Sequence, residues 1–130
     1  MTPELIGRFL VTAFFAVVFL QSALDKIADP EGNLEYMRDH FKTSPFPPEM
    51  VRSMFRVLTF LEATAGVLCA LGVLFLSFRN PGMNLASLGV AVGGLALLSL
   101  MFGQRLAKDY AGAAVVAAYF AVDLLGLALF

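Results

Sequence analysis

Residues 83–103 contain no charged side chain, and this stretch limits most strictly what the chain can fold into. A helix that crosses a bilayer needs about 20 mainly apolar residues, and similar stretches lie at about 5–24, 54–78 and 111–130. Hydrophobic residues make up 59% of the 130, whereas soluble domains carry about 45–50%. We therefore predict an all-α membrane protein, one domain over residues 1–130, with four transmembrane helices in an antiparallel bundle.

The only long polar segment, residues 28–49, follows the first apolar stretch. Asp29-Pro30-Glu31-Gly32 is typical of a turn, and Asn33 is a suitable residue to cap a helix. Apolar side chains then recur on one side of that helix, at Leu34, Met37 and Phe41. This pattern predicts a short helix at the membrane interface between the first and second spans.

Four spans place both termini on one side of the membrane and the first and third connections on the other. The side with the first and third connections, together with the span ends beside them, carries seven basic residues: Lys26, Arg38, Lys42, Arg52, Arg56, Arg105 and Lys108. The termini side carries only Arg8 and Arg79. The positive-inside rule then predicts that the two long connections are cytoplasmic.

Several classes of function are not indicated by this sequence. The net charge is -1 and no basic patch is present, so nucleic acid is not an expected partner. The single cysteine, Cys69, cannot form a disulfide within the chain, and we expect it to be a packing residue. His40 is the single histidine, expected on the surface of the interfacial helix, and no metal, haem, flavin or nucleotide motif is evident.

Glu62 is a carboxylate inside the second apolar stretch, and no further charge follows until Arg79. Ionisable groups are costly inside a membrane and commonly mark functional sites. The topology brings polar residues from all four spans to the same membrane face. We predict a cluster there, formed by Lys26, Arg56, Glu62, Gln104, Arg105, Asp109 and Tyr110.

This cluster has two interpretations. In the first, the cluster lines a pocket for an amphiphilic molecule. The aromatic and hydrogen-bonding groups that a quinone head needs would come from Tyr110, Phe55, Phe60 and Gln104. Glu62 beside such a head could exchange protons with it. In the second, the charges only hold four helices in register.

Asp123 is a second carboxylate at membrane depth. It lies about 20 Å along the last span from Tyr110, close to the predicted depth of Arg8. We therefore predict a buried ion pair between Arg8 and Asp123. In the third span, Gly89 and Gly93 form a GxxxG pattern, which suits either a homo-oligomer seam or packing within the chain's own bundle.

Several short motifs resemble the DoxX-like family of small four-helix membrane proteins. Residues 19–27, Phe-Leu-Gln-Ser-Ala-Leu-Asp-Lys-Ile, are similar to the family's Ser-Gly-x-x-Lys-Leu ending of span one, with Ala23 where the family has glycine. Leu61-Glu62 with Gly66 and Leu71-Gly72 resembles its Leu-Glu…Gly…Leu-x-Gly pattern, and the connection with Pro47 resembles its proline-bearing loop.

The resemblance implies a multi-pass protein of the inner (cytoplasmic) membrane that is associated with redox metabolism. It marks Lys26 and Glu62 as signature polar positions. Our first hypothesis is a subunit of a redox complex that docks a protein partner and contacts quinone; such a chain is at most a membrane subunit of an oxidoreductase, since no complete active site is visible. The alternative is a non-catalytic scaffold or assembly factor. A carrier for a hydrophobic solute is less favoured, because no span is broken.

Overall fold

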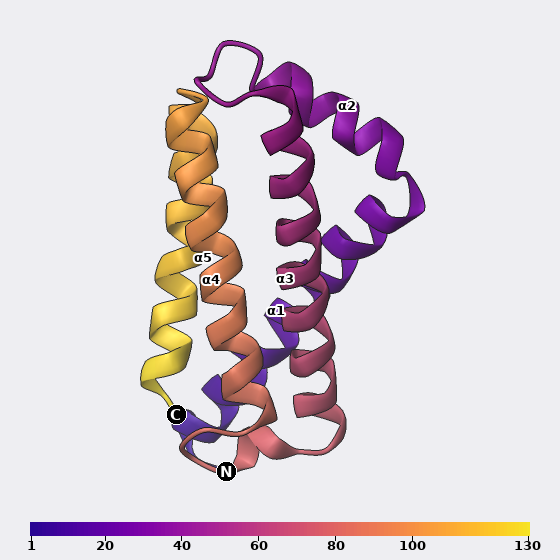
Figure 1. The fold of residues 1–130 in the computed structure, drawn as a ribbon. Helices are drawn as coiled ribbons and strands as arrows, with labels where there is room; N and C mark the ends of the chain where they lie inside the picture. The colour runs from indigo at the N-terminus through magenta and orange to yellow at the C-terminus, as the bar shows by residue number, and fades with distance from the viewer.

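The computed structural model describes residues 1–130 and contains helices but no strand. The elements are α1 (Pro3–Ala28), α2 (Pro30–His40), α3 (Pro48–Leu74), the short 3-10 helix η1 (Ser77–Arg79), α4 (Leu85–Leu106) and α5 (Tyr110–Ala128), as Figure 1 shows. Four of them, α1, α3, α4 and α5, are long and apolar enough to cross a membrane. The prediction of an all-α fold with four apolar spans is confirmed, and the chain has the architecture of a multi-pass membrane protein.

The boundaries of the second span differ most from the prediction of 54–78. Helix α3 begins at Pro48, because proline has a fixed φ and no amide hydrogen and so fits the first helical turn. It ends at Leu74, and two residues later Leu76 adopts a left-handed conformation with φ of 58°. The other three spans are displaced by smaller amounts from the predicted 5–24, 83–103 and 111–130.

The interfacial helix α2 begins earlier than expected. Asp29 caps it, because Oδ1 accepts a hydrogen bond from Gly32 N at 3.1 Å, and Pro30 is the first helical residue. The prediction that Asn33 is the cap was therefore wrong. Asn33 Nδ2 instead donates to the carbonyl oxygens of Asp25 and Asp29, at 3.1 and 2.8 Å, which ties α2 to the end of α1.

Helix α3 occupies the centre of the arrangement and packs against both α1 and α4. Helix α5 packs against α4 and α1, whereas α2 lies outside the four long helices, against α3 and α1. Both chain termini lie at the end of the bundle opposite α2 (Figure 1). The four long helices are therefore antiparallel in sequence order, as predicted.

Small residues allow the helix backbones to approach closely. A Cβ atom on Gly66 of α3 would lie 2.8 Å from the Leu20 amide nitrogen of α1, and one on Gly89 of α4 would lie 2.7 Å from the Cys69 amide nitrogen of α3. Gly93 is in turn covered by the Phe19 ring. Both glycines of the GxxxG pattern are thus buried inside this chain's own bundle, which favours the intramolecular alternative over an oligomer seam.

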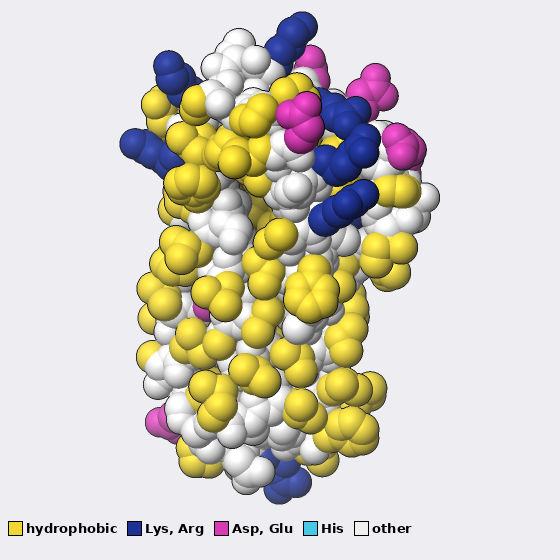
Figure 2. Space-filling model, in the orientation of Figure 1, with side chains coloured by type: hydrophobic (Ala, Val, Ile, Leu, Met, Phe, Trp, Pro, Cys, Tyr) yellow, Lys and Arg dark blue, Asp and Glu magenta, His cyan; other side chains and the backbone are white.

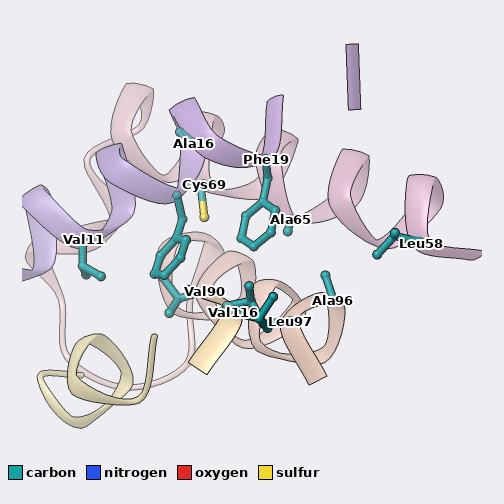
Figure 3. Close-up of a cluster of buried hydrophobic side chains, with 11 residues drawn as sticks. Val11, Ala16, Phe19, Leu58, Ala65, Cys69, Val90, Ala96, Leu97 and Val116 are labelled. Atoms are coloured by element: carbon teal, nitrogen blue, oxygen red, sulfur yellow. The ribbon is translucent and has the colours of Figure 1, made fainter. Parts of the chain in front are cut away.

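The core lies where α1, α3 and α4 meet (Figure 3). Phe19, Cys69 and Val90, one from each of these helices, are labelled there and are at most 2% exposed. Outside the core, apolar side chains cover the flanks of the bundle and charged side chains gather toward its ends (Figure 2). A bilayer would stabilise this distribution, because the apolar flanks match its hydrocarbon region.

Candidate functional site

Glu62 is buried and forms an ion pair with Lys26. The carboxylate of α3 is 1% exposed, and its Oε2 lies 3.3 Å from Nζ of Lys26 in the last turn of α1. The ammonium group also donates to Oγ of Ser22, one turn earlier, at 2.9 Å. The close approach of α1 and α3 at Gly66 places these two helices near enough for the contact. The two signature positions that the resemblance marked are therefore in direct contact.

The pair retains capacity for further hydrogen bonds. Oε1 of Glu62 is buried and has no hydrogen-bond partner within the chain. Lysine has three donors, and Lys26 uses two of them, on Glu62 and Ser22. Because the Lys26 side chain is 16% exposed, its remaining donor is the accessible part of this pair.

A second polar set joins α2 to the α4–α5 connection. His40 Nε2 lies 2.9 Å from Gln104 Oε1, so that a protonated Nε2 donates to the amide oxygen. The same nitrogen lies 3.8 Å from Oδ2 of Asp109, whose other oxygen accepts from Gly112 N at 2.9 Å and caps α5. His40 lies on α2, as expected, but its side chain is only 21% exposed and contacts two residues of the predicted cluster, Gln104 and Asp109.

The seven-residue cluster is therefore divided into parts. Arg56 is exposed and forms no ion pair, while the Arg105 guanidinium lies over the Tyr110 ring, 4.8 Å from its centroid. Glu62 and Asp109 have separate partners. The reason is depth: Glu62 lies 14 residues beyond the first residue of α3, about 21 Å along the helix axis, whereas Asp109 lies at the very start of α5.

A groove of about 990 Å³ opens between α2, α3 and α4 and is bordered by both polar sets. Lys26 lines it from α1, His40 from α2, and Gln104 and Arg105 from the end of α4. Most of its lining is apolar and includes Met54, Phe55, Leu98 and Met101. None of the 21 lining residues is an aspartate or a glutamate, so the groove presents cations and hydrogen-bond donors without a carboxylate.

The aromatic residues expected at this pocket are only partly present. Phe55 and Gln104 line the groove, as predicted, but Phe60 and Tyr110 do not. Phe60 is 70% exposed and lies on another face of α3. Tyr36 of α2 supplies an aromatic ring in their place. No periodicity in the sequence could have placed α2 over this part of α3, because that position depends on the turn between α1 and α2.

The predicted ion pair between Arg8 and Asp123 is not formed. Arg8 Nε donates to the carbonyl oxygen of Leu129 at 2.8 Å, and its Nη1 donates to that of Arg79 at 3.2 Å. Asp123 is fully buried, and neither of its oxygens has a hydrogen-bond partner. Arg8 lies level with Leu129, whereas Asp123 comes six residues, or about 9 Å, before Leu129, toward the start of α5.

No protein-family model matches this chain, and no similar protein was found among curated proteins or solved structures. The fold and the site define a four-helix membrane protein with an apolar groove beneath its short α2 helix.

Proposed function

We propose that this chain is a membrane subunit of a quinone-linked redox system in the cytoplasmic membrane, and that it holds the quinone in the groove between α2, α3 and α4. The groove is the observation that carries this proposal. Its volume of about 990 Å³ is large enough for an amphiphile, and its lining is mainly apolar with a few polar groups.

The groove has the chemistry that a quinone requires. Quinone carbonyl oxygens accept hydrogen bonds, and the groove offers donors on Lys26 and Gln104. An isoprenoid tail is flexible and apolar, and methionine side chains such as Met54 and Met101 adapt well to such ligands. Glu62 does not line the groove, so its role would be to orient Lys26 and set its charge environment.

The resemblance to the DoxX-like family supports the redox assignment, because its two signature polar positions, Lys26 and Glu62, contact each other beside the groove. Electrons would pass between the bound quinone and a protein partner docked at the end of the bundle that carries α2. With the basic connections in the cytoplasm, this docking end would face the cytoplasm.

Two leucines of α4 provide a matched test. Leu95 and Leu98 are both 55% exposed, but only Leu98 lines the groove. We expect Leu98→Trp to fill the groove and weaken the binding of decyl-benzoquinone in lipid nanodiscs at least tenfold, and Leu95→Trp to bind like the wild type. The proposal fails if the wild type does not bind the quinone or if both variants bind equally.

The buried Lys26–Glu62 contact favours one alternative function, a scaffold in which charges only fix helix packing. In that case, the binding of protein partners that purify with the chain in mild detergent would require only that the chain is folded. We expect Gln104→Leu, which changes the groove and leaves the Lys26–Glu62 pair intact, to impair quinone binding but keep the partners. A scaffold would show no quinone binding at all.

A further inference from the structure

Asp123 is a buried carboxyl that the proposed groove does not use. No residue of α5 lines the groove, and Asp123 is 0% exposed. Its Oδ1 packs against the α4 backbone, since a Cβ atom on Gly94 would lie 2.7 Å from it. Neither Oδ1 nor Oδ2 accepts a hydrogen bond from any group of the chain.

No group near Asp123 compensates a negative charge. Helix α4 has no charged residue before Arg105, at its far end, and the α1 cation Arg8 is held by the Leu129 and Arg79 carbonyls. The titratable residue that α3 contributes to this layer is Cys69, a buried thiol with no positive charge. The other titratable groups of α1 are Glu4, near its start, and Asp25 and Lys26, near its end. All three lie outside the buried centre of this helix.

The cost of burial decides which form of Asp123 is present. A neutral polar group without a partner costs about 1–3 kcal/mol when buried in a protein. An isolated ionised carboxylate costs far more, tens of kcal/mol in an ideal medium of low dielectric constant, so such groups neutralise instead. Ionisable side chains within membrane spans often mark ion pathways and proton relays.

No cluster of acidic, histidine or cysteine metal ligands surrounds Asp123. Ca²⁺ takes six to eight oxygen ligands, and Mg²⁺ requires six in near-octahedral geometry. The chain has no group of three or more His, Cys, Asp or Glu side chains that could hold a metal ion. A proton, in contrast, needs only one carboxylate oxygen.

We propose that Asp123 is a proton-binding site within the bilayer, which holds its proton at neutral pH and exchanges it with water. This site is separate from the groove and does not depend on the quinone assignment. It differs from Glu62, whose Oε2 lies 3.3 Å from the Lys26 ammonium group.

Infrared difference spectroscopy of the whole protein in lipid vesicles at neutral pH tests the proposal. We expect Asp123→Asn to remove the carbonyl band of a protonated carboxylic acid, and we expect that band in the wild type to shift in D2O. Loss of carboxylate bands instead, or an acid band that never shifts in D2O, would overturn the proposal. The matched variant Glu62→Gln should lose carboxylate bands and keep the acid band.

A second measurement does not require a substitution at Asp123. In wild-type protein with carboxyl-labelled ¹³C-aspartate, the acid band should move, because Asp123 is the only buried aspartate. The others, Asp25, Asp29, Asp39 and Asp109, are exposed or half-buried outside the core. If the label moves carboxylate bands only, Asp123 is ionised and the proposal is wrong.

Discussion

Glu62 and Asp123 are both carboxyls buried at membrane depth, but their surroundings are opposite. Glu62 has the Lys26 ammonium group 3.3 Å from Oε2, whereas both oxygens of Asp123 lack any partner. Lys26 in turn lies beside the groove, and Asp123 lies against the glycine backbone of α4. The same chemical group is thus placed once as part of an ion pair and once alone.

The difference shows how neighbouring helices determine what a buried carboxyl can do. A paired carboxylate fixes the position of its cation, so the Lys26–Glu62 pair suits the orientation of a ligand. An unpaired carboxyl is stable only with its proton, so Asp123 suits proton uptake and release. Each of the following substitutions changes one side of this comparison.

Removal of the cation should have the largest effect. Lys26→Met leaves the Glu62 charge buried without compensation, and we expect the free energy of unfolding to fall by about 3 kcal/mol. Unfolding of the protein in mixed micelles, followed by circular dichroism, measures this loss. Lys42→Met is the control, because Lys42 is exposed and has no ion-pair partner. Equal stability of the two variants would show that the pair is not formed in the folded protein.

An added methyl group should disturb the packing beside Glu62 more than the packing beside Asp123. Gly66→Ala presses a methyl group against the Leu20 backbone, near the Lys26–Glu62 pair, and overpacking of this kind costs about 1–3 kcal/mol. Gly94→Ala meets only the end of the Asp123 side chain, which can rotate, so the loss of unfolding free energy should be smaller. The same micelle experiment compares them, and a larger loss for Gly94→Ala would contradict the packing described.

Replacement of the unpaired carboxyl by its amide should cost less than the same change at the paired one. Asp123→Asn has nearly the volume of the protonated acid and breaks no hydrogen bond, so we expect a loss of unfolding free energy of about 1 kcal/mol, from the additional unpartnered N–H of the amide. Glu62→Gln should cost more, because it deprives Lys26 of its counter-charge. Thermal unfolding in lipid nanodiscs ranks the two variants. The reverse order would mean that Asp123 is the carboxyl with the stronger partner.

Arg8→Gln should have no effect on Asp123. It removes the hydrogen bond from Nε to the Leu129 carbonyl and should cost about 1 kcal/mol of stability. The acid band assigned to Asp123 should remain in the infrared spectrum, because the two side chains do not touch. If the wild type instead showed carboxylate bands of Asp123 that Arg8→Gln converted into an acid band, the ion pair that the sequence predicted would be revived.

The sequence predicted the four spans well, because length and apolar character determine which segments cross a membrane. It also placed Lys26 and Glu62 in one polar cluster, and these two side chains are in contact. The division of the polar cluster could not be predicted. It depends on the depth of Glu62 within α3, which lies about 21 Å along the helix axis from Pro48.

The Arg8–Asp123 prediction failed for a related reason. A rise of 1.5 Å per residue gives the depth of a side chain only in a helix that is not tilted. It also does not show that Arg8 donates its hydrogen bonds to backbone carbonyl oxygens. The contacts of His40 were also outside the reach of sequence patterns, because the path of α2 depends on how Asp29 and Asn33 hold it to α1.

A double-mutant cycle at Lys26 and Glu62 tests the central comparison most directly. The unfolding free energy of the double variant Lys26→Met/Glu62→Leu is compared with those of the two single variants and the wild type in the same micelles. If the groups form a buried ion pair, the double variant recovers most of the stability that Lys26→Met alone loses, because no buried charge remains. Losses that simply add would contradict the pair and, with it, the difference between Glu62 and Asp123.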